Sequence, residues 1–406
     1  MSLMEIRKIS NKNIVSPRGF TAGGMHCGIK QNKKDLALLV SEVPASVAGV
    51  FTTNAVQAAP LKVTKEVVYQ ASKMQALIVN SGNANACTGK QGLIDAYEMQ
   101  SLAAKKLAID PALVGVASTG VIGEIMKMEP IRANIEKLEL GSTTEHGIDF
   151  AQAILTTDTV MKNTSYSTII DGQEVVISGT AKGSGMIEPN MATMLGFITT
   201  DANIESDVLQ KALSDITNVT FNSITVDGDT STNDTVIVMA NGLAGNASLT
   251  PVHPDWDSFY STLQLVAEDL AKAIARDGEG ATKLIEVEVS GALCDEEARK
   301  IAKTVVGSPL VKTAVFGNDA NWGRIIAAVG YSGATVDPEK ISIKIGNALM
   351  VQDGEPIPFS EEELIEILKA DEVKIYVFLG QGEGHGLAWG CDLTYDYVKI
   401  NASYRS

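Results

Sequence analysis

The sequence predicts a fold of mixed helices and strands, which we assign to the α+β class. Short apolar runs such as Leu36 to Val40 and Thr235 to Ala240 are typical of buried strands. Another segment repeats apolar residues at the spacing of an amphipathic helix: Phe259, Leu263, Val266, Leu270 and Ile274. Because 45% of the 406 residues are hydrophobic and 20% are charged, the chain can bury a large core, in one large domain or in a few smaller ones.

Composition narrows the classes of function. The net charge of −16 disfavours nucleic acid as a partner, because basic side chains supply most of the affinity for phosphates. The chain has no apolar run of roughly 18 residues and no signal peptide at its start, so we expect no membrane segment. The cysteines form no Cys-x-x-Cys pair, which argues against a zinc knuckle or a disulfide framework and favours the cytoplasm. They are Cys27, Cys87, Cys294 and Cys391.

Three successive strands are predicted near the N-terminus, at Leu36 to Val40, Val47 to Thr52 and Ala76 to Val79. The third leads into Asn80 to Ala86, a run of small polar residues ahead of a helix that extends through Leu107. Such a loop can bind an anion at the N-terminus of a helix. The glycine spacings of phosphate-binding loops are missing, however, so a tight structural turn explains these residues at least as well.

Two further elements of the first half end in polar residues. A strand from Val114 to Ala117 leads into Thr119 and Gly120, where a backbone N–H group and a hydroxyl could stabilise an oxyanion. Taken alone this is a weak signal, because Ser-Thr-Gly occurs in many loops. A helix from Phe150 to Leu155 ends at Thr156 to Thr159, residues that usually cap a helix or form a turn.

The segment from Lys182 to Phe197 is a glycine-rich loop that leads into a buried strand, and Thr193 lies at the junction, after Ala192. A threonine at such a place is usually a β-branched core residue. It could instead be a nucleophile if cleavage made it the first residue of a new chain, because its own α-amine then serves as the base. That amine has a pKa of about 7.7–8.0, which suits a general base.

Helices and strands continue to alternate after Thr193. We predict helices at Val208 to Ile216, Phe259 to Ile274, Asp295 to Val306 and Glu361 to Lys369, and one that begins at Trp322. We predict strands at Thr235 to Ala240, Ile285 to Val289 and Val373 to Leu379, and one that ends at Phe316.

Several acidic residues of this half are candidate ligands, and His385 is the one candidate for a catalytic histidine. Asp227, Asp229 and Asp234 fall in one polar loop, but the glycine and the closing glutamate of an EF-hand are missing, so we expect no metal. Glu279 lies between glycines in a loop, where a glutamate is normally solvated. His385 also lies in a glycine-rich loop and has no second histidine at metal-ligand spacing.

Eight blocks carry a resemblance to a known family. They are Gly49–Asn54, Asn80–Ala86, Ser118–Gly123, Thr156–Thr159, Lys182–Leu195, Asp277–Lys283, Gly317–Arg324 and Asn401–Ser406. In this order they resemble the ornithine acetyltransferase family, the glutamate N-acetyltransferases or ArgJ proteins of arginine biosynthesis. The resemblance extends over essentially the whole chain.

The resemblance implies an architecture and a processing step. Its fold is a layered αββα sandwich of the ArgJ/DmpA-like N-terminal-nucleophile type. Self-cleavage between Ala192 and Thr193 would give chains 4–192 and 193–406, and family members are usually heterotetramers of two chains of each kind. Within the second chain we place a C-terminal lobe at about residues 293 to 406.

The resemblance also implies a reaction: acetyl transfer from N2-acetyl-L-ornithine to L-glutamate by a ping-pong mechanism. It makes Thr193 the nucleophile and assigns the oxyanion hole to Thr119 and Gly120. The implied substrate contacts are Thr156, Lys182, Thr193, Glu279, Asn401 and Ser406, with Thr157 as an alternative to Thr156. No cofactor or metal is implied, and use of acetyl-CoA as a further acetyl donor is left open.

Two alternatives remain at the level of sequence. An amidase or aminopeptidase of the same fold would use the same threonine but pass the acyl group to water, and only the acceptor separates the two. A non-enzymatic anion-binding protein would keep Thr193 as an ordinary core residue and would remain a single uncleaved chain.

Overall fold

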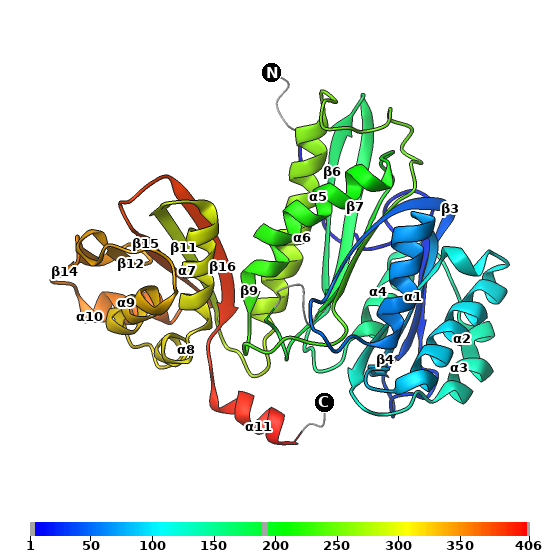
Figure 1. Cartoon of the computed structure of the whole chain (residues 1–406), viewed down its shortest axis with the longest axis horizontal. Helices are drawn as coiled ribbons and strands as arrows, with labels where there is room; N and C mark the ends of the chain where they lie inside the picture. Colours follow the sequence, from blue (N-terminus) through cyan, green and yellow to red (C-terminus); the bar gives the residue numbers. More distant parts are fainter. Residues whose placement is uncertain (1–4, 189–193, 404–406) are drawn as a thin grey trace.

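The protein is described by a computed structural model that covers residues 5–188 and 194–403. Its helices are α1 (Ala59–Glu66), α2 (Gly89–Leu107), α3 (Met128–Asn134), α4 (Thr144–Ile154), α5 (Ser206–Val219), α6 (Trp256–Arg276), α7 (Asp295–Gly307), α8 (Pro309–Phe316), α9 (Trp322–Tyr331), α10 (Glu361–Leu368) and α11 (Tyr395–Ser403). The strands form two sheets, which lie side by side in Figure 1.

The first sheet has nine strands in the order β1-β6-β7-β8-β10-β3-β4-β5, with β2 paired to β3. Their bounds are β1 (Arg7–Lys8), β2 (Phe20–Met25), β3 (Leu36–Phe51), β4 (Lys73–Asn83), β5 (Val114–Val121), β6 (Lys162–Ile170), β7 (Gln173–Lys182), β8 (Leu195–Thr200) and β10 (Thr235–Ala240). The second sheet has seven strands in the order β14-β13-β12-β15-β11-β16-β9. Their bounds are β9 (Ile224–Thr225), β11 (Leu284–Ala292), β12 (Ser342–Ile345), β13 (Ala348–Gln352), β14 (Glu355–Pro356), β15 (Glu372–Phe378) and β16 (Gly384–Cys391).

The first sheet folds over on itself along the long strand β3. The first half of β3 pairs with β2 and β4, its second half pairs with β10, and the register shifts between Val40 and Ala45. Side chains from both halves of the sheet, among them Leu39, Phe197 and Ile237, meet in one buried cluster. The sheet therefore forms two leaflets that pack face to face.

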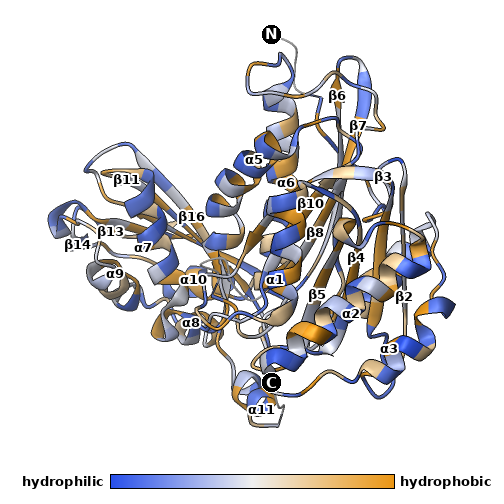
Figure 2. Ribbon diagram, turned by 45° about the vertical axis from the view of Figure 1, so that its right-hand side comes forward, coloured by the Kyte–Doolittle hydropathy of each residue, from blue (hydrophilic) through white to orange (hydrophobic). Residues whose placement is uncertain are grey.

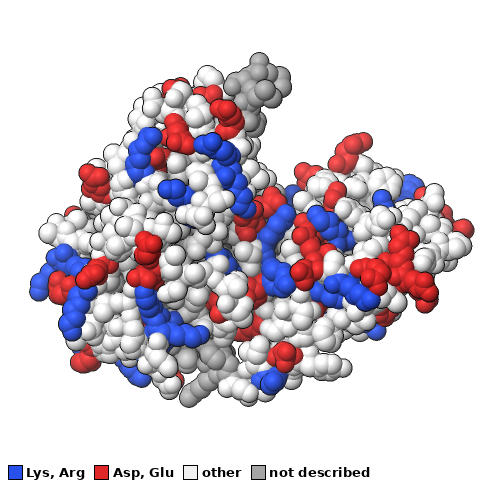
Figure 3. Space-filling model, turned by 180° about the vertical axis from the view of Figure 1, so that it is seen from behind, with Lys and Arg blue, Asp and Glu red and all other residues white. Residues whose placement is uncertain are grey.

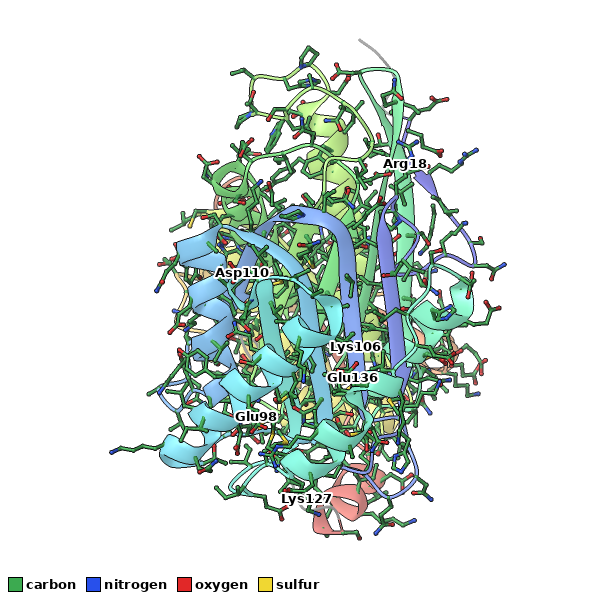
Figure 4. The ribbon with its side chains drawn as sticks, turned by 90° about the vertical axis from the view of Figure 1, so that its right-hand side faces the viewer. Arg18, Glu98, Lys106, Asp110, Lys127 and Glu136 are labelled. Atoms are coloured by element: carbon green, nitrogen blue, oxygen red, sulfur yellow. The ribbon has the colours of Figure 1, made fainter. Side chains whose placement is uncertain are left out.

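Helices cover the outer faces of both leaflets. Helices α5 and α6 pack on the leaflet of β6, β7, β8 and β10, whereas α2 and α3 pack on the leaflet of β3, β4 and β5. Figure 2 shows hydrophobic strands enclosed by helices with hydrophilic outer surfaces. Figure 4 views the α2–α3 side, where Lys106 Nζ donates a hydrogen bond to the Glu136 carbonyl oxygen at 3.2 Å. This order of layers confirms the predicted α+β class and the αββα sandwich.

Helix α6 joins the sandwich to the second sheet. Leu263 and Leu270 of α6 belong to the same buried cluster as Trp389 and Cys391 of β16. In addition, the Lys272 Nζ atom lies 5.1 Å from the centre of the Trp389 ring. One helix is therefore a packing surface for both sheets, which fixes the second sheet against the sandwich.

The second sheet has its own core beneath helices α7 to α10. It includes β9 and β11, both of which precede residue 293, where the sequence placed the start of a C-terminal lobe. The division of the chain at residues 192 and 193 and the lobe from about 293 to 406 stay predictions.

The surface carries charges of both signs. Figure 3 shows lysines and arginines interspersed with aspartates and glutamates over the face that it presents, without one broad basic area among the residues described. No helix in the described ranges 5–188 and 194–403 is long and apolar enough to cross a membrane.

Most predicted elements are confirmed, but the two strands predicted at Leu36 to Val40 and Val47 to Thr52 form one strand, β3, and the strand predicted to end at Phe316 is wrong. Residues Pro309–Phe316 form helix α8, which Pro309 opens and Ser308 caps by accepting the Val311 N–H at 3.4 Å. A short apolar run does not distinguish a buried strand from a buried helix by its periodicity. The Ser-Pro pair was the signal that favoured a helix.

Phe197 gives a test of the sandwich. Its ring meets that of Phe150 edge to face between the leaflets, with centroids 5.8 Å apart, so Phe197→Ala leaves a cavity in the central core. We expect a loss of about 3–5 kcal/mol in unfolding free energy, measured by chemical denaturation. Phe378→Ala is the matched control, because that ring is 51% exposed and should cost much less. Equal losses from both variants would contradict the packing described.

Candidate active site

One cavity of about 170 Å³ brings together most of the residues selected from the sequence. Its lining is Ala84, Thr119, Gly120, Ile122, Thr156, Thr157, Lys182, Gly185, Met186, Asp227, Asp229, Ser231, Asn233, Glu279, Tyr397 and Asn401. Both Thr156 and Thr157 contribute, so the choice between them stays open. Ala192, Thr193 and Ser406 lie outside the described residues.

Strand β5 delivers the Thr119-Gly120 pair to the cavity. It runs parallel to β4, so the polar loops that follow both strands lie at the same edge of the sheet. Gly120 has φ +133°, and a Cβ atom there would lie 2.4 Å from the carbonyl carbon of Gly82. Only glycine fits this close approach, which places the Gly120 backbone at the cavity wall.

Lys182, at the end of β7, brings a buried amine to the same wall. Its Nζ atom donates a hydrogen bond to Thr119 Oγ1 at 3.3 Å. Burial lowers the pKa of Lys182, although Asp158 opposes that shift. Because the amine donates into Thr119 Oγ1, the hydrogen of the Thr119 hydroxyl is free to point elsewhere.

A buried ion network supports Lys182 from behind. Asp158 bonds to Lys162 Nζ at 2.7 Å and accepts the Gly183 N–H at 2.7 Å, while Lys162 Nζ also bonds to Asp277 at 2.6 Å. Burial by itself would raise the pKa of Asp158, but the ammonium groups of Lys182 and Lys162 and the Gly183 N–H hold it below its ordinary value. Asp158 also accepts the Thr156 N–H at 3.0 Å, which orders the threonine loop.

The cavity lining also contains acidic residues. Glu279 accepts a hydrogen bond from Asn401 Nδ2 at 2.8 Å, and its own N–H donates to the Ser184 carbonyl at 3.0 Å. A Cβ atom at Gly185 would lie 2.4 Å from a Glu279 carboxylate oxygen, so any larger residue there would displace this side chain. Asp227 and Asp229 line the cavity as well. One cavity thus contains both an amine and carboxylates.

The chain leaves and re-enters the described region next to Lys182. The Cα partner of Lys182 across the β7–β8 pair is Leu195, and the Met194 carbonyl accepts the Thr235 N–H at 3.0 Å. Asp234 is fully buried there, and its Oδ2 atom has no hydrogen-bond partner in residues 5–188 and 194–403. Burial raises the pKa of Asp234 well above its ordinary value.

Sequence reasoning assigned no role to Asp158, Lys162 or Asp277, although Asp158 and Asp277 lie in blocks of the family resemblance, and it treated Asp227 only as a candidate metal ligand. Lys162 gives little local signal, because it begins a mostly polar strand, although a charge that is buried needs a partner. His385, the one histidine considered as catalytic, lies on β16 and contacts Glu288 at 3.2 Å instead of lining the cavity.

One group of possible metal ligands occurs in the described part of the chain, at the turn between β6 and β7. The ligand atoms of Asp171, His253 and Asp255 all lie within 4.8 Å of one another. The His253 Nδ1 atom accepts the Asp255 N–H at 3.1 Å, so the neutral ring carries its proton on Nε2, 3.3 Å from Asp171. A protonated Nε2 cannot bind a metal, and we assign none to this group.

The ion network predicts a pH-dependent contribution to stability. Asp158→Asn removes the carboxylate that offsets the buried Lys182 ammonium and one of the two carboxylates bound to Lys162, and should lower the unfolding free energy by about 3–5 kcal/mol at neutral pH. The folded-state pKa of Asp158 is depressed, so this contribution is complete above about pH 4 and is lost as the pH falls further.

Chemical denaturation of both proteins between neutral and acidic pH checks this expectation. Asp215→Asn, at an exposed ion pair with Lys211, is the control and should leave stability essentially unchanged. A constant difference between wild type and Asp158→Asn down to acidic pH would contradict the assignment.

Comparisons with known proteins agree on one family. A model of the ArgJ family matches residues 21–406. The chain is 60% identical over 402 residues to the arginine biosynthesis bifunctional protein ArgJ of Geobacillus kaustophilus, covering 99% of this chain and 98% of that protein. A crystal structure of the arginine biosynthesis bifunctional protein argJ from Bacillus halodurans is 66% identical, with a TM-score of 0.52. That match covers 52% of this chain and 100% of the crystal chain. A structure of ornithine acetyltransferase complexed with ornithine from Mycobacterium tuberculosis is 34% identical, with a TM-score of 0.43, and covers 46% of this chain and 98% of its own.

Proposed function

Because the chain belongs to the ArgJ family and is an acetyltransferase of arginine biosynthesis, we propose that it transfers acetyl from N2-acetyl-L-ornithine to L-glutamate through Thr193. The observation that carries the proposal is the cavity itself. It joins a possible oxyanion hole at Thr119 and Gly120, a buried amine at Lys182 and a carboxylate at Glu279. These are the groups that acyl transfer between amino acids requires.

The first step is self-cleavage. The Thr193 hydroxyl oxygen attacks the Ala192 carbonyl carbon, the peptide C–N bond breaks, and the acyl group moves to oxygen while the nitrogen becomes an amine. Water then hydrolyses the ester, which leaves a carboxylate on Ala192 and restores the hydroxyl. The crystal chain of the Bacillus halodurans relative supports this step, because its full length matches only about half of this chain.

The cleavage products would remain one folded unit. Strand β8 belongs to the second product, yet it lies between β7 of the first product and β10. Separating the two chains would break the centre of the sheet. We therefore propose that both chains stay together, in a heterotetramer of two chains of each kind in the cytoplasm.

The second step is acetyl transfer to the enzyme. The α-amine of Thr193, with an ordinary pKa of about 7.7–8.0, takes the proton from its own hydroxyl as the oxygen attacks the acetyl carbonyl. The Gly120 N–H and the Thr119 hydroxyl donate to the oxyanion, and Lys182 keeps Thr119 oriented. Ornithine leaves with the proton on its α-nitrogen, and the acetyl group stays on Thr193 as an ester.

The third step passes the acetyl group to glutamate. The neutral α-amine of glutamate attacks the ester carbonyl, its proton returns to the threonine oxygen through the α-amine of Thr193, and N-acetylglutamate leaves. Lys182 pairs with the substrate α-carboxylate, whereas Glu279 and Asn401 face its amino end. Thr156 and Ser406 are proposed as further contacts.

A second acetyl donor fits the name of the relatives. The Geobacillus kaustophilus protein is called bifunctional. We propose acetyl-CoA as the additional donor, delivering its acetyl group to the same threonine. An amidase of the same fold differs from the transferase in its acyl acceptor, which is water. With acetylornithine alone, the amidase would turn over continuously, whereas the transferase would release a single equivalent of ornithine.

Thr193→Ala tests the nucleophile. Wild-type protein should give two chains that end at Ala192 and begin at Thr193, and the variant should remain one chain without acetyl transfer. Intact mass under denaturing conditions and an assay of N-acetylglutamate formation measure the two results. An uncleaved wild-type chain that is fully active would rule out this mechanism.

Thr119→Val tests the oxyanion hole, because valine keeps the shape of threonine but removes the hydroxyl. We expect kcat to fall about 10²–10³-fold, with a smaller change in KM. Thr119→Ser, which retains the hydroxyl, should recover most of the activity. Complete cleavage of each variant is verified first, so that a lower rate reports on acetyl transfer alone. A wild-type kcat in Thr119→Val would contradict the assignment of Thr119 to the oxyanion hole.

A further inference from the structure

Asp227 holds the loop that enters the cavity from the side of Lys182. Its Oδ2 atom accepts the Met186 N–H at 2.7 Å, and its Oδ1 atom accepts the Ile187 N–H at 2.8 Å. The carboxylate thus holds two consecutive backbone groups of this loop, and its Oδ1 atom also accepts the Asp229 N–H at 3.2 Å. Hydrogen bonds to a charged acceptor are stronger than those between neutral groups.

The loop that Asp227 holds has an unfavourable backbone conformation. Met186 has φ +58°, in the left-handed region. Residues with a Cβ atom, apart from asparagine and aspartate, rarely adopt this conformation. Such a conformation persists only where surrounding contacts enforce it. The two bonds from Asp227 are contacts of this kind, because they act at Met186 and at the residue that follows it.

The rest of the segment from 226 to 230 runs along the same loop. The Val226 N–H donates to the Ile187 carbonyl at 2.7 Å, and Thr230 Oγ1 donates to the Glu188 carbonyl at 3.1 Å. Glu188 is the last described residue before the gap that contains Ala192 and Thr193. This segment therefore holds the described chain up to Glu188.

Other anchors of the loop act earlier along it. Asp158 accepts the Gly183 N–H, and Ser184 bonds to Asp277 and Glu279 through its hydroxyl and its carbonyl. These anchors fix the start of the loop, next to Lys182. Asp227 is the carboxylate that fixes its last described turn.

We propose that Asp227 is a positioning residue for self-cleavage: by holding Met186 and Ile187, it fixes the described end of the loop that leads to Ala192 and Thr193. This proposal rests on the proposed function. Asp227 acts through the loop backbone and takes no part in bond making. Self-cleavage consumes no substrate, so this role can be measured apart from substrate binding.

The experiment follows cleavage of newly synthesised full-length chain with time on a denaturing gel. Asp227→Ala should slow cleavage at least about 10-fold, because it removes both acceptors. Asp227→Asn retains one acceptor oxygen, so its cleavage rate should lie between those of the wild type and Asp227→Ala. Asp227→Glu keeps both oxygens and should cleave faster than Asp227→Ala. Circular dichroism and the thermal unfolding midpoint establish that each variant folds.

Asp392→Asn is the matched control. Asp392 also accepts two consecutive backbone N–H groups, those of Thr282 and Lys283, at 2.8 and 3.0 Å, but it lies outside the cavity lining. It should lower the thermal midpoint and leave the cleavage rate at the wild-type value.

Two outcomes would overturn the proposal: wild-type cleavage in a folded Asp227→Ala protein, or equal slowing by Asp392→Asn, which would reveal general destabilisation. If Asp227→Ala does not fold, the rates of the asparagine and glutamate variants decide. A wild-type chain that never cleaves would instead contradict the proposed function, so the two failures are distinguishable.

Discussion

The site depends on keeping the amine of Lys182 buried beside Thr119. A buried ammonium is tolerated only with a nearby anion, and Asp158 supplies it while also binding Lys162 and the Gly183 N–H. Lys162 in turn binds Asp277, two residues before Glu279. The electrostatic requirement of one amine thus fixes the end of β7, the threonine loop after α4 and the loop that carries Glu279.

The topology explains how residues distant in sequence reach one cavity. The two leaflets meet along β3, and the polar loops after β4 and β5 lie at the edge where β7 ends and β8 begins. Helix α6 packs on both sheets and ends at Arg276, just before the loop of Asp277 and Glu279. A cleavage before β8 would leave this arrangement intact, because β8 is held by strands on both sides.

Local sequence patterns predicted helices and strands where the periodicity of apolar residues is clear. The periodicity of α6 and the alternation of β15 identified both elements, whereas residues 309–316 were misassigned because a uniformly apolar run fits either structure. Thr119, Gly120, Lys182, Glu279 and Asn401 were selected mainly from the family resemblance, and they share one cavity. Asp158 and Asp277 lie in blocks of the resemblance without an assigned role, and Asp227 lies outside these blocks. Their roles come from partners such as Lys162, which lies 115 residues from Asp277 and is not paired with it by any sequence rule.

The measurement that tests the central claim most directly is the mass of the 193–406 chain after incubation with N2-acetyl-L-ornithine in the absence of glutamate. The mechanism predicts a chain heavier by one acetyl group, with the group on Thr193. Adding glutamate should remove it and form an equal amount of N-acetylglutamate. Acetyl transfer at the wild-type rate without any acetylated chain, even on rapid quenching, would contradict a threonine intermediate and favour direct transfer between the two amino acids.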